Sequence, residues 1–177
     1  MAFRLRDGEE AEENGSEERW KTWYAYLEIS GNSPWFNNQS YVDTLNPEAI
    51  CEFIRVTYEA YERELDEEFG KSVSMIFTDE PQFSFKTQFG YAEEEKYQTI
   101  PYTDDFEETY MQTYGESFLD YLPEIFWDLP NNRVSVHRYR YHDHVCQRFT
   151  ESYADQIGRW CDEHGILLTG HMMRKTF

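Results

Sequence analysis

The chain has 177 residues, and 16 basic against 35 acidic side chains give it a formal net charge of −19. Aromatic residues make up 18% of it, and such large apolar side chains offset the entropy cost of folding, which argues against a disordered chain. Like charges repel, so we expect neither nucleic acid nor an anionic membrane as a partner. Aromatic rings stack on sugars and carboxylates accept hydrogen bonds from sugar hydroxyls, so the composition favours a carbohydrate ligand.

The sequence predicts a cytoplasmic protein. Its first 19 residues, MAFRLRDGEEAEENGSEER, have no apolar stretch of signal-peptide length, and no window approaches the roughly eighteen apolar residues of a membrane span. The three cysteines, Cys51, Cys146 and Cys161, are odd in number and form no CxxC motif, so we expect reduced thiols.

Residues 1–19 form an acidic N-terminal segment, with a strand candidate at residues 3–6 before a solvated loop. Residues 20–29, WKTWYAYLEI, are rich in β-favouring aromatic side chains and predict a strand. A loop containing Pro34 and several Asn and Ser residues follows. We expect the folded domain to cover residues 20–177.

The first helix is predicted from Asn46, a favourable N-cap, and Pro47, which suits the first helical position. Gly70 is placed to end it in a left-handed conformation. Its apolar residues recur at three- and four-residue spacing and predict one buried face: Ile50, Phe53, Ile54, Tyr58, Tyr61 and Leu65.

A short apolar run at residues 73–77 follows this helix and ends in Asp79, Glu80 and Pro81. A helix, a turn and an apolar run of this kind predict a parallel strand buried on both faces, as in α/β proteins. Ligands of such folds bind at the carboxyl ends of the strands. Residues 82–103 are expected to form a long aromatic loop.

The second half of the chain predicts two more helical regions and a strand. One runs from Phe106 to about Tyr114, breaks at Gly115 and continues to about Trp127. The other ends at Gly165 and is followed by a strand at residues 166–170. The buried face of that last helix is predicted to comprise Val145, Phe149, Tyr153, Ile157, Trp160 and Cys161.

The strand-end acids are the strongest chemical signal. Partial burial among aromatic rings would raise the pKa of such a carboxyl group and let it donate a proton near neutral pH. Adjacent strand residues face opposite sides, so we assign Glu80 as the acid/base and Asp79 as an orienting or sugar-binding group. The alternative is that both acids only form a turn before Pro81. His171 follows the last strand, and the alternative to a sugar-binding role is a histidine in the core or one that only supports a neighbouring site residue.

His142 and His144 invite a metal interpretation. In a helix they lie about 200° apart and cannot share an ion, whereas in an extended segment they lie on one side. The basic, aromatic context favours a solvated or partner-facing helix start over a metal site. The acid-rich loops have no EF-hand-like spacing, so we expect no bound metal. Phosphate-loop and GxGxxG motifs are absent, so we expect no cofactor, and no GxSxG motif indicates a serine nucleophile.

Six groups of residues, taken in order, resemble large TIM-barrel glycoside hydrolases of the α-L-rhamnosidase-like kind. They are SPWFN at 33–37, VD at 42–43, FTDEP at 77–81, IPYTDDF at 100–106, YLPEIF at 121–126, and WC at 160–161 leading to TGH at 169–171.

The resemblance implies an α/β fold, a partial (β/α) TIM-type barrel over residues 20–177, that hydrolyses O-glycosidic bonds. It gives Glu80 a catalytic-carboxylate position with Asp79 beside it, and it gives His171 a place lining the sugar pocket. The other substrate-binding residues that we predict are Trp35, Asn37, Asp43, Tyr102 and Trp127.

A complete barrel needs eight strands and about 250 residues, whereas the sequence predicts three or four strands. Glycoside hydrolysis also needs two carboxylates across the scissile bond, and one convincing member is present. We therefore expect a truncated barrel that is weakly active or inactive. The alternative is a non-catalytic carbohydrate-binding or self-associating remnant, with homo-oligomers formed through exposed barrel edges.

Overall fold

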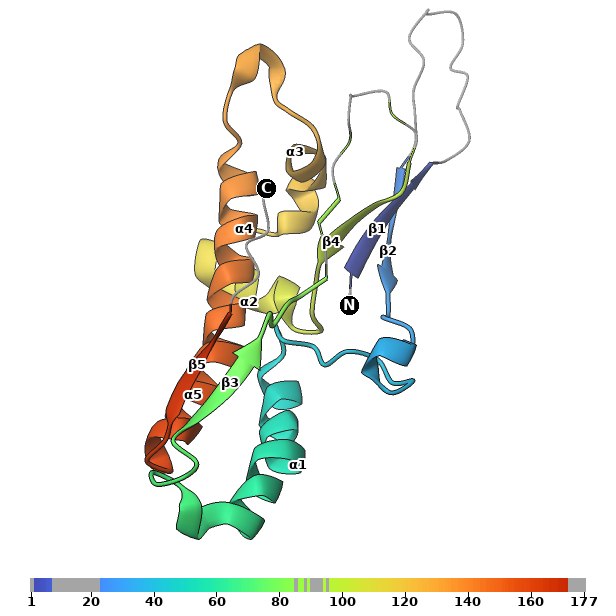
Figure 1. Cartoon of the computed structure of the whole chain (residues 1–177). Helices are drawn as coiled ribbons and strands as arrows, with labels where there is room; N and C mark the ends of the chain where they lie inside the picture. The colour runs from blue at the N-terminus through green and yellow to red at the C-terminus, as the bar shows by residue number, and fades with distance from the viewer. Residues whose placement is uncertain are drawn as a thin grey trace, which may run out of the picture. The chain divides into compact units, whose positions relative to one another are not determined.

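The computed structural model describes residues 2–7, 23–84, 86–87, 89, 94 and 96–171 of the chain (Figure 1). The chain divides into two compact units, and each has its own small β-sheet. Unit 1 consists of residues 1–40 and 84–143, and unit 2 of residues 41–83 and 144–177. None of the helices among the described residues is long and apolar enough to cross a membrane. The predicted boundary between residues 19 and 20 lies outside the described residues.

The sheet of unit 1 is antiparallel. Its central strand β1 (Ala2–Asp7) pairs with β2 (Trp23–Glu28) on one side and with β4 (Gln98–Pro101) on the other (Figure 1). The two N-terminal strands confirm the prediction. β4 lies in the stretch predicted as loop, and its side chains Gln98 and Ile100, two residues apart, are both fully buried, as the side-chain alternation of a strand requires.

Helical elements supply the rest of unit 1. They are η1 (Pro34–Phe36), α2 (Phe106–Tyr114), η3 (Phe118–Tyr121), α3 (Leu122–Phe126), η4 (Pro130–Asn132) and most of α4 (Val136–Phe149). Gly115 ends α2 with a φ of 74°, which confirms the predicted break.

The core of unit 1 is a cluster of aromatic rings. Phe106, Tyr110, Phe118 and Tyr141 are completely buried, and Phe106 contacts the other three rings at centroid distances of 5.3 to 6.4 Å. The hydroxyl of Tyr141 donates a hydrogen bond to the carbonyl oxygen of Pro101 at 2.6 Å, which joins α4 to the end of β4. Burial raises the pKa of Tyr141 well above its usual range, so the phenol stays a donor.

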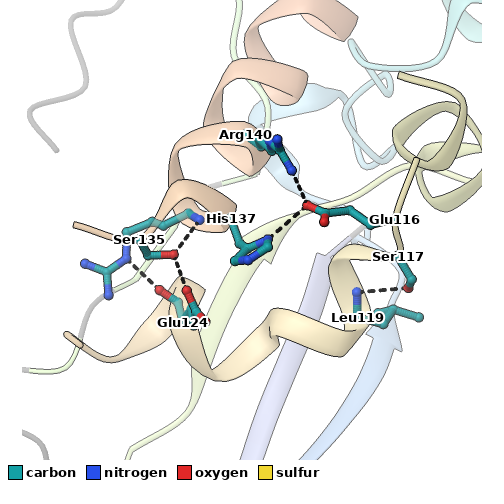
Figure 2. Close-up of polar contacts among 8 residues, drawn as sticks. Glu116, Ser117, Leu119, Glu124, Ser135, His137 and Arg140 are labelled. Atoms are coloured by element: carbon teal, nitrogen blue, oxygen red, sulfur yellow. Dashed lines mark hydrogen bonds and ion pairs between the residues drawn. The ribbon is translucent and has the colours of Figure 1, made fainter. Parts of the chain in front are cut away.

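Side chains at the start of α4 hold the segment that precedes it (Figure 2). The hydroxyl of Ser135 accepts a hydrogen bond from the backbone N–H of Arg138 and donates one to Glu124. The guanidinium of Arg138 donates to the backbone carbonyls of Glu124 and Trp127 and to the carboxylate of Asp128. This hydrogen bonding satisfies the carbonyls at the end of α3 and fixes the chain between α3 and α4.

Glu116 is a second point of attachment for α4. Its Oε1 lies 2.9 Å from Nδ1 of His137 and 2.6 Å from Nη1 of Arg140. Figure 2 draws both contacts. The ring of His137 also stacks on Tyr121, with centroids 3.5 Å apart. Partial burial acts to raise the pKa of Glu116, but its hydrogen bonds to Arg140 and His137 outweigh burial and lower that pKa below the ordinary value of 4.5.

We expect the stability that Glu116 contributes to disappear in acid. A carboxyl group whose pKa is lower in the folded state stabilises the fold above its unfolded-state pKa, and this contribution is lost as the pH falls through the folded-state value. The Glu116→Gln variant should therefore be less stable than the natural chain at pH 7, and the difference should shrink at pH 3. Urea unfolding at both pH values measures this, with the exposed Glu108→Gln as control. A difference that stays constant contradicts the assignment.

In unit 2, α1 (Pro47–Leu65) begins as the sequence predicts. Oδ1 of Asn46 accepts hydrogen bonds from the backbone N–H groups of Glu48 and Ala49 at 2.9 and 3.2 Å. A short η2 (Asp66–Glu68) follows α1, and Gly70 adopts the expected left-handed conformation. The predicted buried face ends early, because Tyr61 and Leu65 at the end of α1 are exposed.

The last helical region consists of three joined elements. α4 continues into a π-helical turn, η5 (Thr150–Ala154), and then α5 (Asp155–Glu163). The buried face predicted for it is confirmed: Val145, Phe149, Tyr153, Ile157, Trp160 and Cys161 are all buried. Strand β5 (Leu167–His171) follows and pairs in parallel with β3 (Met75–Asp79), shown in red and green in Figure 1.

The predicted partial (β/α) barrel is wrong. In the described part of the chain, parallel pairing stops at β3 and β5, and the other three strands form an antiparallel sheet. A barrel requires every strand to pair in parallel with two neighbours. The local pattern of a helix followed by an apolar strand occurs twice, before β3 and before β5. This pattern does not determine which strands pair.

The expectation that β3 is buried on both faces is also wrong. Ile76 and Thr78 on one face are partly buried, whereas Met75 and Phe77 on the other are 48% and 55% exposed. Leu167 of β5 is likewise exposed. The β3–β5 sheet therefore has one covered face and one apolar face that is open among the described residues.

Candidate functional site at the carboxyl ends of β3 and β5

The register of β3 and β5 places two predicted site residues side by side. Asp79 pairs with His171 at the last position of each strand. Nδ1 of His171 lies 3.4 Å from Oδ1 of Asp79, and both side chains are 73% exposed. Asp79 is separated from His171 by 92 positions of sequence, so parallel pairing alone brings these groups together.

An aromatic ring completes this group on the same face of the sheet. Phe77, two residues before Asp79, meets the ring of His171 edge to face, with centroids 5.1 Å apart and an interplanar angle of 86°. Side chains two residues apart in a strand share a face, which is why Phe77 and Asp79 lie together. A carboxylate, an imidazole and a phenyl ring thus form one exposed surface at the strand ends.

Glu80 continues the pairing beyond the end of β3. Its backbone N–H donates a hydrogen bond to the carbonyl oxygen of His171 at 2.9 Å. Its φ of 46° is in the left-handed region, which is uncommon for residues other than glycine and turns the chain at this point. The side chain is exposed. The strand-end turn that the sequence left open is therefore real, and it is anchored to the residue that faces Asp79.

The covered face of the sheet fixes the strand ends from behind. Oγ1 of Thr78 and the hydroxyl of Tyr153 lie 2.5 Å apart and share a hydrogen bond. Tyr153 belongs to the π-helical turn and stacks on Phe149 with an interplanar angle of 14°. Burial raises the pKa of the Tyr153 hydroxyl, and the hydrogen bond from Thr78 partly offsets this. The turn after Glu80 is held in addition by Thr44, whose hydroxyl donates to the carbonyl oxygen of Gln82.

Two expectations about the strand-end residues need correction. Asp79 and Glu80 are exposed, so the burial that was to raise a carboxyl pKa does not surround them in the described structure. His171 is exposed as well, so it is not a core histidine. Of the predicted loop 82–103, residues 84–103 belong to unit 1, and the strand ends belong to unit 2.

The other predicted substrate-binding residues have separate environments. Asp43 in unit 2 accepts a hydrogen bond from the backbone N–H of Leu45, a local turn contact. The remaining four belong to unit 1. Trp35 in η1 is 87% exposed, and Asn37 is the left-handed residue that ends η1. Tyr102 packs on the core ring of Phe106. Trp127 contacts Trp23 and Phe89.

Sequence reasoning missed Phe77 and Tyr153 as parts of this group. Phe77 was interpreted as a core residue of a strand with two buried faces, although its two-residue spacing from Asp79 was a usable signal. Tyr153 was assigned correctly to a buried helix face. It hydrogen-bonds to Thr78 from a π-helical turn, and the sequence analysis predicted no such turn.

The described residues contain no group of three or more His, Cys, Asp or Glu side chains arranged to hold a metal ion. His142 and His144 lie in α4, and the helix turns them to different sides. An open pocket of about 370 Å³ in unit 1 lies around Asp128, Arg133 and Arg138, and none of the predicted site residues lines it. Comparison with protein-family models, curated proteins and solved structures found no match.

Proposed function

We propose that this chain binds carbohydrate through Phe77, Asp79, Glu80 and His171, the strand-end group. The observation that carries the proposal is the exposed Asp79–His171 pair with the Phe77 ring against it. Sugars present hydroxyl groups around apolar ring faces. A carboxylate and an imidazole beside an aromatic ring supply acceptors, a donor and an apolar contact for such a ligand.

Within this proposal, glycoside hydrolysis is the reaction that the motif resemblance suggests. Asp79 is within ion-pair distance of His171, so it suits holding and orienting the sugar. Glu80 lies in the turn that follows, and the acid/base role proposed for it rests on the motif resemblance. Hydrolysis needs a second carboxylate across the glycosidic bond. We therefore expect binding to be easier to detect than turnover.

Asp79→Asn is expected to weaken sugar binding at least tenfold, because a hydrogen bond to a charged group contributes about 1.5–3 kcal/mol. Calorimetric titration with L-rhamnose and with rhamnose-containing and other oligosaccharides measures it. Glu80→Gln should leave binding within a few-fold and lower any release of reducing sugar by about 100-fold or more.

Asp162→Asn, an exposed acid on α5 of the same unit, is the matched control and should bind as the natural chain does. The proposal fails if no sugar of the panel binds, or if Asp79→Asn and Asp162→Asn bind equally well. Binding that is lost in Asp79→Asn, with no turnover in any variant, supports a carbohydrate-binding protein over a hydrolase.

Self-association stays a prediction from the sequence. One structural observation favours it: Met75, Phe77 and Leu167 leave an apolar surface open on the β3–β5 sheet. The barrel edges through which it was expected do not exist, since the sheet is not part of a barrel.

A further inference from the structure

Lys86 is held in a defined position next to a histidine of α4. Its Nζ lies 2.9 Å from Nε2 of His142, and both side chains are partly buried. The next residue, Thr87, exchanges two hydrogen bonds with Thr99 of β4: its N–H donates to the Thr99 carbonyl, and its Oγ1 accepts from the Thr99 N–H. The backbone beside Lys86 is thereby fastened to the sheet of unit 1.

The charges around Lys86 are unusual in so acidic a chain. The described charged or titratable groups that act on it are His142 and Arg138, both on α4. Among the described residues, no carboxylate lies within ion-pair distance of its Nζ. The other two described lysines are ordinary by comparison. Lys96 lies 2.9 Å from Glu94, and Lys71 is exposed and donates to a backbone carbonyl.

This environment gives Lys86 a larger uncharged fraction than an ordinary lysine has. Burial, together with the positive charge of Arg138, lowers the pKa of Lys86 to about 8. Burial, with Lys86 and Arg138 as further causes, also lowers the pKa of His142 to about 4. The imidazole is therefore neutral at pH 7, and its Nε2 accepts a hydrogen bond from Nζ without adding a charge. A desolvated lysine next to a cation is a recognised form of activated nucleophile.

We propose that Lys86 is a nucleophilic amine that forms a Schiff base with a small aldehyde. Nζ attacks the carbonyl carbon, the C=O π electrons move to oxygen, and a proton passes from nitrogen to oxygen through solvent to give a carbinolamine. Loss of the hydroxyl group together with the remaining proton of the nitrogen, as water, then forms the C=N bond. The partial burial of Nζ limits the substrate to a small one, and His142 positions the amine.

The test is a competition among the lysines of the natural chain. The protein is incubated with glycolaldehyde and cyanoborohydride, which reduces the imine to a stable secondary amine, and the modified lysines are identified by peptide mapping. At pH 8 about half of Lys86 is uncharged, against well under 1% of an ordinary lysine with a pKa near 10.4. Nucleophilicity falls as pKa falls, which offsets part of this gain, as it does for thiols.

We expect Lys86 to be modified about tenfold faster than Lys71 or Lys96 at pH 8, with a rate that levels off above that pH. Lys86→Arg should remove the fast-forming adduct from the intact protein. The proposal is overturned if Lys86 reacts no faster than Lys71, if its rate keeps rising to pH 10 as that of Lys71 does, or if Lys86→Arg keeps the fast adduct. The comparison needs no sugar binding, so it is independent of the function proposed for the strand ends.

Discussion

Replacing Gly170 with alanine is expected to disrupt the β3–β5 sheet and to lower the free energy of unfolding by about 3 kcal/mol or more. A Cβ atom at this position would lie 1.9 Å from the carbonyl oxygen of Thr78 and 2.8 Å from its carbonyl carbon. Both are backbone atoms of the neighbouring strand, which cannot move aside as a side chain would. The two strands would have to separate at the position before Asp79 and His171.

Gly158→Ala is the matched control for this prediction. Gly158 lies in α5 of the same unit, and its added Cβ would meet only the side chain of Leu168, at an ordinary contact distance of 4.0 Å. Because alanine is a better helix former than glycine, Gly158→Ala should be neutral or stabilise by up to about 1 kcal/mol. Urea unfolding monitored by circular dichroism measures both variants. Equal stability of the two variants would show that the strands are not packed as closely as described.

Gly170 also links the sheet to the proposed function. Its lack of a side chain lets β5 approach β3 closely enough for His171 to face Asp79. A glycine at this position of a strand permits a close approach, either of a ligand or of a neighbouring backbone. The structure identifies the neighbour as the backbone of Thr78. Even if Gly170→Ala separates the two strands only in part, it should therefore weaken sugar binding as well as lower stability.

Elements with a local signal were predicted well. Asn46 and Pro47 start α1, Gly115 ends α2, and the three- and four-residue spacing from Val145 to Cys161 marks a face that is buried throughout. Each of these signals acts between residues close in sequence, where capping, φ preference and helix periodicity apply directly. Element type and limits therefore followed from the residues themselves.

Pairing between distant strands was not predictable in the same way. β1 lies between β2 and β4, and β4 comes more than 90 residues after β1 in the chain. An apolar run such as residues 73–77 looks the same whether its strand has two neighbours or one, because periodicity reports burial and not the partner. The predicted barrel required a further neighbouring strand for both β3 and β5, and neither has one among the described residues.

The two candidate sites also differ in how much of each could be predicted from the sequence. Asp79 and His171 were both predicted at the ends of strands in a parallel sheet, but that these two strands pair with each other is known only from the structure. Lys86 and His142 gave no joint signal, because a loop residue and a helix residue 56 positions apart meet only through tertiary packing. Contacts of this kind determine reactivity, and they require the folded chain.

The aromatic content that distinguishes this acidic chain serves first as core, and truncating its centre should be costly. We expect Phe106→Ala to lower the free energy of unfolding by about 3–5 kcal/mol, since the variant loses apolar burial and leaves a cavity. Phe106 is completely buried and contacts four rings, those of Tyr102, Tyr110, Phe118 and Tyr141. Rings that are already closely packed around it can collapse only partly into the space.

Tyr139→Ala gives the matched control, because Tyr139 is an aromatic residue of α4 whose side chain is 66% exposed. Its removal should change the free energy of unfolding by no more than about 0.5 kcal/mol. Urea titration followed by far-ultraviolet circular dichroism and by tryptophan fluorescence measures both variants at equal protein concentration. A loss below about 1 kcal/mol for Phe106→Ala would mean that the ring cluster is not the core of unit 1. In that case, the high aromatic content would need another explanation, with more of the rings available to a ligand.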